Sequence, residues 1–168
     1  GPGNDAGLYF VPDEAGTYYI EASSNNDRNM GTYKVEVVLR DLPPDDVGND
    51  LSTTVSLNPG DSFSGNLLTQ NDQDWFKIQL TGGEDYVFRL KGAHSGSGSL
   101  VDPVLEVRAG DGTLLDSVDN RLVSNEPAML FTPTDNGTYY LVARAADGQN
   151  DTGTYELVTR APDDYSNT

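Results

Sequence analysis

The chain has 168 residues, enough for one ordinary domain with a buried core, and no apolar run approaches the roughly 20 residues that span a bilayer. Its formal net charge of −17 at pH 7 repels phosphate backbones and anionic lipid, so we expect neither a nucleic-acid partner nor membrane insertion. Cysteine is absent, which excludes disulfides and thiolate metal sites, and 18 glycines with 9 prolines indicate short strands joined by tight turns.

The N-terminal residues contain a pattern that returns near the end of the chain. LYFVPDEAGTYYIEA, which starts at Leu8, corresponds to MLFTPTDNGTYYLVA, which starts at Met129, 121 positions later. GTYKVEVV from Gly31 then corresponds to GTYELVTR from Gly153, and acidic segments follow both pairs. Such self-similarity predicts tandem copies of one domain, an arrangement that is typical of long secreted or surface proteins.

These correspondences predict the domain organisation. We expect residues 1–3 to be the remnant of a cleaved tag, 4–40 the C-terminal hairpin of a preceding repeat, 41–50 an acidic linker, 51–160 a complete repeat, and 161–168 the start of the next linker. A lone two-stranded hairpin is only marginally stable in water. Its apolar face therefore has to be covered, either by a neighbouring repeat of the same chain or by a second molecule in a strand-exchanged dimer.

Within the complete repeat the periodic segments alternate as strands do, and none shows helical periodicity. Glycine-containing turns such as NPGD, TGGED and DNG separate them. The expected strands are 53–57, 62–66, 74–80, 86–91, 104–108, 114–118, 129–132, 137–144 and 153–160. This spacing predicts an all-β fold, an antiparallel β-sandwich, whose core faces are Phe76/Ile78/Leu80, Tyr86/Phe88/Leu90, Tyr139/Leu141/Ala143 and Tyr155/Leu157.

Two aspartates stand at the start of one predicted strand, in the stretch NDQDWF. Calcium takes roughly six to eight oxygen ligands, and Asp72 and Asp74 can direct two carboxylates at one ion. The acidic linker completes the set if the first strand runs beside the strand of Asp74, because it offers Asp45, Asp46, Asn49 and Asp50. The alternative is a solvated, turn-forming aspartate cluster. Two clusters in one unit and the large negative charge favour calcium.

Three stretches carry a resemblance to a known family: PPDDVGNDLSTTVSLNPGDSFSGNLLTQNDQDWFKIQL, DPVLEVRAGDGTLLDSVDN and FTPTDNGTYYLVARAADGQNDTGTYELV. In this order they resemble the bacterial pre-peptidase C-terminal domain family, relatives of the collagen-binding domains of clostridial collagenases. The resemblance implies a jelly-roll-like β-sandwich, secretion, and no catalysis. It also implies calcium held between the acidic linker and the strand start, by Asp45, Asp46, Asn49, Asp50, Asp72 and Asp74. Collagen binding is not carried over, because no collagen-contacting row of aromatic residues is identified.

Other residues are weaker candidates. Further acidic and amide side chains are secondary candidates for metal ligands, namely Asp119, Asn120, Asp147 and Asp151. Trp75 faces away from Phe76, and with Tyr140 it is a candidate platform for sugars or peptides; the alternative is that these rings pack under a neighbouring loop or repeat. The only histidine, His94, lies in a Gly/Ser-rich loop without an ordered carboxylate and nucleophile, so we expect no enzyme.

The sequence therefore predicts a non-catalytic, calcium-stabilised β-sandwich repeat of a large secreted or cell-surface bacterial protein. It would act as a spacer or adhesion module, or as an accessory domain beside an enzyme, in contact with neighbouring repeats. The alternative is a module that binds an extracellular polysaccharide or protein through exposed aromatic side chains.

Overall fold

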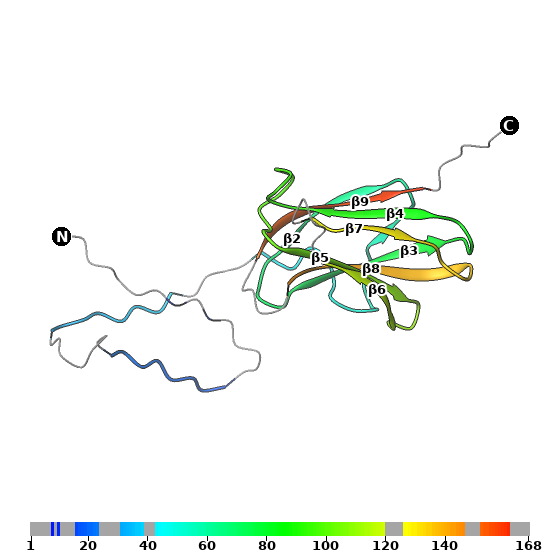
Figure 1. The fold of residues 1–168 in the computed structure, drawn as a ribbon. Coiled ribbons are helices and arrows are strands. Elements are labelled where there is room, and N and C mark those ends of the chain that lie inside the picture. Colours follow the sequence, from blue (N-terminus) through cyan, green and yellow to red (C-terminus); the bar gives the residue numbers. More distant parts are fainter. Residues whose placement is uncertain are drawn as a thin grey trace. The chain divides into compact units, whose positions relative to one another are not determined.

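The computed structural model describes residues 8, 10, 16–23, 31–38, 43–119, 126–146 and 152–161 (Figure 1). The chain divides into two units, residues 1–42 and 43–168, and each is described by itself. Within the described residues no helix reaches the length and apolarity needed to cross a membrane.

The described residues of unit 43–168 form two β-sheets that pack face to face (Figure 1). The strands described are β1 (Ser56–Leu57), β2 (Ser62–Leu67), β3 (Gln73–Leu80), β4 (Tyr86–Lys91), β5 (Pro103–Ala109), β6 (Leu114–Val118), β7 (Ala128–Phe131), β8 (Gly137–Ala145) and β9 (Gly153–Arg160). One sheet has the order β1-β3-β8-β5-β6 and the other β2-β9-β4-β7. The predicted all-β sandwich is confirmed, and each predicted strand overlaps an observed one.

The two sheets are predominantly antiparallel, with one parallel pair at the start of the unit. The first strand is shorter than predicted, and β1 pairs with β3 in parallel. The chain runs beside β3 before β1 begins, since Trp75 N–H donates to the Gly48 carbonyl (3.1 Å) and Lys77 N–H to the Val55 carbonyl (3.0 Å). These bonds hold the start of the unit in the same direction as β3, so the acidic segment before Gly48 lies at the start of β3.

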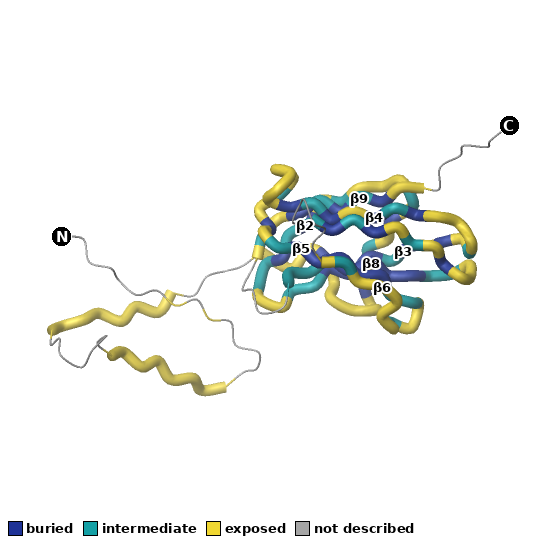
Figure 2. Tube along the Cα trace, in the orientation of Figure 1, coloured by how far each residue is buried: buried dark blue, intermediate teal, exposed yellow. Residues whose placement is uncertain are grey.

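The core lies between the two sheets and follows the strand alternation (Figure 2). All predicted core residues are buried, from Phe76 on β3 to Leu157 on β9. Val47 also belongs to this core although it precedes β1, and it anchors the acidic segment against the sandwich. Apolar burial of this kind contributes roughly 25 cal/mol per Å² and dominates the stability of the fold.

The described residues of unit 1–42 differ from the sandwich, because they carry no assigned strand and their apolar side chains are exposed (Figure 2). Those exposed side chains are Leu8, Phe10, Tyr18, Tyr19, Ile20, Tyr33, Val35, Val37 and Val38. Within this unit Phe10 and Tyr18 pack edge to face, with ring centroids 5.1 Å apart.

Candidate metal centre

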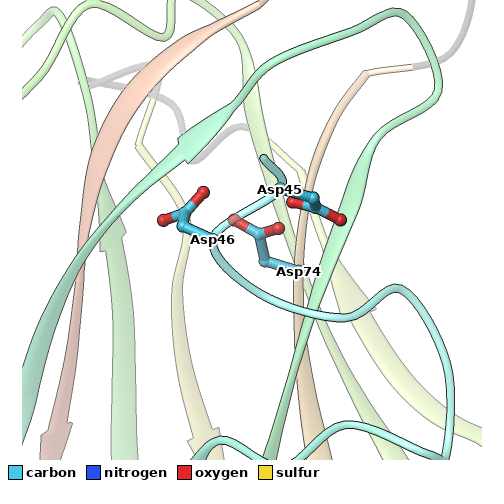
Figure 3. A group of neighbouring side chains, drawn as sticks. All are labelled: Asp45, Asp46 and Asp74. Atoms are coloured by element: carbon cyan, nitrogen blue, oxygen red, sulfur yellow. The ribbon is translucent and has the colours of Figure 1, made fainter. Parts of the chain in front are cut away.

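Three aspartates from two chain segments converge at the start of β3 (Figure 3). Asp74 is the second residue of β3 and shares the core-facing side of the strand with Phe76. Asp45 and Asp46 lie just before the buried Val47, so the anchoring of Val47 brings them to the same place. One oxygen from each carboxylate lies within 4.8 Å of the other two. Asp45 and Asp46 are exposed, whereas Asp74 is fully buried.

Asp74 is also held from the opposite sheet. The hydroxyl of Tyr155 on β9 donates a short hydrogen bond to Asp74 Oδ2, so the side chain of Tyr155 reaches across the core. Gly65 on β2, the register partner of Tyr155, leaves room for this ring, because a Cβ there would lie 2.3 Å from the Tyr155 hydroxyl oxygen. Asp74 Oδ1 is buried and has no hydrogen-bond partner among the described residues. A buried ionised carboxylate oxygen without a partner is costly, and either a bound cation or a proton would relieve that cost.

The buried carboxyl of Asp74 holds its proton tightly when no cation is present. Burial, with smaller contributions from nearby Asp72, Asp46 and Asp45, raises the pKa of Asp74 from 3.8 to about 8, although the bond from Tyr155 opposes the rise. Burial and the charge of Asp74 raise the pKa of Tyr155, so this phenol stays a hydrogen-bond donor. A divalent cation supplies the positive charge that keeps such carboxylates ionised.

We expect the stability of the calcium-free protein to fall as the pH rises from about 4 to about 8. The folded state binds the Asp74 proton more tightly than the unfolded state does, so stability is greatest below about pH 4, where both states are protonated, and it falls until about pH 8, where the folded state also ionises. Urea unfolding of metal-stripped protein near pH 5.5 and near pH 9 measures the difference. Equal or greater stability at the higher pH contradicts the assignment, and saturating calcium should remove the decline.

The remaining predicted ligands take different positions. Asp72 is half-buried, and its Oδ2 accepts from Leu68 N–H at 2.6 Å. Burial, and to a smaller extent the charge of Asp45, raises the pKa of Asp72. It therefore lies near the three-carboxylate group of Asp45, Asp46 and Asp74 without belonging to it. Asp50 Oδ1 accepts from Ser52 N–H at 2.7 Å, and its hydrogen bonds with Ser52 lower its pKa, as in an ordinary turn. Asn49 is exposed.

Only one of the secondary candidates lies among the described residues. Asp119 is exposed after the end of β6 and is absent from the three-carboxylate group. The other secondary candidates, Asn120, Asp147 and Asp151, lie outside the described residues.

Trp75 and Tyr140, on the outer face of sheet β1-β3-β8-β5-β6, are buried, which favours packing under neighbouring segments over a platform for a sugar or peptide. Their exposed fractions are 8% and 5%, and their ring centroids are 5.8 Å apart. The guanidinium of Arg108 lies 5.0 Å from the Trp75 ring centroid, and the Tyr140 hydroxyl donates to the Leu51 carbonyl at 3.4 Å. These neighbours cover the rings, which leaves neither of them as a platform for a sugar or peptide.

The same outer face holds a buried ion network that no sequence pattern indicated. Glu106 on β5 is only 3% exposed and accepts from Arg144 Nε (2.7 Å) and from Arg108 Nε (2.9 Å) and Nη2 (2.5 Å). Arg144 comes from the neighbouring strand β8, so strand register brings the network together. Two guanidinium groups thereby neutralise the buried carboxylate of Glu106. A neighbouring strand that lacked such a positive charge would leave this carboxylate buried without full compensation.

No known family profile matches the chain, and no curated protein matches it. Among solved structures, it is similar to the pre-peptidase C-terminal domain of collagenase from Bacillus anthracis, at 15% identity and TM-score 0.49, over 71% of this chain and 100% of that chain. It is also similar to PliG, a periplasmic inhibitor of g-type lysozyme from Aeromonas hydrophila (10%, TM-score 0.42, 63% and 96%). A third is CorA, a surface-associated copper-binding protein of Methylomicrobium album BG8 (14%, TM-score 0.42, 64% and 98%). At these values the similarity concerns overall architecture and assigns no function to this chain.

Proposed function

We propose that residues 43–161 form a non-catalytic, calcium-stabilised β-sandwich module of a secreted or surface-attached bacterial protein. The observation that supports this most strongly is the fully buried carboxylate of Asp74, with one oxygen held by Tyr155 and the other without a partner, beside Asp45 and Asp46. Carboxylate oxygens are the ligands that hard divalent cations prefer. The module would serve as a spacer, an adhesion module or an accessory domain beside an enzyme.

Calcium suits this donor set better than other common cations. It accepts six to eight oxygens in flexible geometry, roughly 2.3–2.6 Å away, whereas magnesium demands near-ideal octahedral geometry and loses water reluctantly. The three carboxylates come from an exposed segment and a rigid strand, an arrangement that adapts to the larger ion. Asp72, Asn49 and Asp50 remain proposed contributors through the family resemblance.

Bound calcium would contribute stability and rigidity. The ion would neutralise mutually repelling carboxylates, so Asp74 would be ionised at neutral pH instead of holding the proton that its pKa of about 8 implies. Asp45 and Asp46 would then be tied to β3, which stiffens the acidic segment where it meets the sandwich. Tyr155 holds Asp74 in place from the other sheet, so the ion would also link the linker segment to both sheets.

Thermal melting of the full chain in calcium, in calcium-free buffer and in magnesium tests this function. At calcium about 100-fold above the dissociation constant, binding to the folded state alone contributes about 2.7 kcal/mol, a rise in melting temperature of about 10 °C for a domain of this size. Magnesium should give a much smaller rise. An unchanged midpoint in saturating calcium would remove the proposal.

A further inference from the structure

The exposed residues of unit 1–42 match residues that are buried in the sandwich. Tyr33 is 76% exposed, whereas its counterpart Tyr155, 122 positions later, is fully buried and bonds to Asp74. Ile20 corresponds in the same way to the buried Leu141 of β8. Side chains with the pattern of β8 and β9 are therefore present twice, and one set has no core around it.

Two further features show that the match extends to packing. Phe10 and Tyr18 form an edge-to-face ring pair with centroids 5.1 Å apart, and their counterparts Phe131 and Tyr139 form the same kind of pair at 5.8 Å. The second feature is the space around one glycine of each copy, Gly31 and its counterpart Gly153.

Gly31 has open space around it, with nothing within 4 Å of a Cβ placed there. Its counterpart Gly153 begins β9 against another backbone segment, where a Cβ would lie 2.7 Å from the Leu100 nitrogen. At Gly153 the neighbouring backbone leaves no room for a side chain, whereas nothing comparable lies near Gly31.

We propose that residues 8–38 supply the equivalents of β7, β8 and β9 to a second β-sandwich of the same architecture, with its own metal centre. Tyr33 would donate to the carboxylate that stands in the place of Asp74 in that sandwich. The metal centre of this second sandwich rests on the function proposed for residues 43–161. The assignment of residues 8–38 as its strands rests only on the correspondence between their exposed apolar side chains and the buried ones of β7, β8 and β9.

A second copy of residues 43–161 is a poor acceptor for this segment. Glu21 corresponds to the buried Val142, which lies directly opposite Glu106 in the strand register. Ser23 corresponds to Arg144, one of the two arginines that neutralise Glu106. Placing residues 8–38 in the β7–β9 positions would set two glutamates against each other and remove one guanidinium, in a region that water scarcely reaches.

The acceptor is thus a sandwich whose strands differ from β3 and β5 of this chain at the charged outer face. It carries a neutral or basic residue in the place of Glu106, where Glu21 of the incoming strand then finds a partner. This charge pattern argues against the strand-exchanged dimer expected from the repeat alone.

An extended protein tests the proposal. An additional copy of residues 43–124, carrying Glu106→Lys, is placed before residues 4–168, so that its residue 124 is followed by Asn4. Residue 125 corresponds to residue 4 in the repeat, so this junction keeps the 121-residue spacing. A matched fusion retains Glu106. Hydrogen exchange is measured over residues 16–23 and 31–38, and calcium bound per chain is measured beside the unmodified chain.

In the Glu106→Lys fusion we expect strong amide protection over both segments and a doubling of the calcium bound, with weaker protection when Glu106 is retained. Gly31→Val should abolish the protection, whereas Gly16→Ala should preserve it, because the counterpart Gly137 has nothing within 4 Å of an added Cβ. Tyr33→Phe should weaken calcium binding in the fusion and leave the unmodified chain unchanged.

Other outcomes overturn the inference in identifiable ways. Unprotected amides in both fusions would exclude residues 8–38 as sandwich strands. Equal protection in both would show that a sandwich with Glu106 accepts residues 8–38 as well as one with lysine there. A dimer of the unmodified chain in light scattering, if it requires residues 8–38, also overturns that argument. Protection without any calcium response would leave the strand assignment standing and count against the metal centre.

Discussion

Replacing Asp74 by asparagine is expected to abolish the stabilisation by calcium and to reverse the order of stability in calcium-free buffer. Asparagine keeps an oxygen that accepts from Tyr155 but brings no charge to the cation, so about 2.7 kcal/mol of linkage energy is lost at calcium about 100-fold above the dissociation constant. Without calcium at about pH 9, the variant escapes the cost of a buried carboxylate beside Asp45 and Asp46 and should be more stable than the wild type.

Chemical unfolding of both proteins with and without calcium measures this reversal. Asp116→Asn is the matched control, because Asp116 lies exposed on β6 and removes the same charge away from the centre. It should leave the calcium response intact. The interpretation of Asp74 as a ligand fails if Asp74→Asn retains the full calcium-dependent shift, or if both variants lose it equally.

Gly65→Ala is expected to destabilise the sandwich by about 3 kcal/mol and to weaken calcium binding as well. The added methyl group meets the hydroxyl, Cζ and Cε1 of Tyr155 at 2.3–2.9 Å, and neither the ring nor β2 can move without disturbing the core. A displaced Tyr155 no longer holds Asp74, so the metal centre is affected although Gly65 carries no ligand atom.

Urea unfolding and calcium titration test the two effects together. Gly137→Ala is the control on β8, where nothing lies within 4 Å of the added methyl group, and it should cost little. Tyr155→Phe separates the two contributions, because it keeps the ring in the core and removes only the hydroxyl. If Gly65→Ala matches Gly137→Ala in stability, Tyr155 is not held as the structure indicates.

Much of the fold follows from short-range sequence patterns. Alternation of period two identified the strands, and it identified the core residues for the same reason, since one face of each strand must be buried. The sequence also identifies the aspartates of the acidic segment and of the start of β3 as candidate ligands, because hard cations prefer oxygen ligands and such side chains gather in loops. Of these, the structure brings Asp45 and Asp46 to Asp74, with Asp72 nearby.

The contacts that the sequence left open all depend on which strands become neighbours. Alternation placed Trp75 on the outer face correctly, but exposure depends on what covers that face, and Arg108 and the segment at Leu51 do so. The charge network of Glu106 likewise requires the register between β5 and β8.

Sequence by itself therefore determined the fold class, the core faces, the repeated sequence pattern and the acidic composition of the candidate centre, because each depends on residues close together in the chain. Only the tertiary structure decided that Tyr155 reaches Asp74 past Gly65, that β1 runs parallel to β3, and that the outer aromatics are covered. Those features arise between residues distant in sequence, where local periodicity carries no information about partners and where packing and register select them.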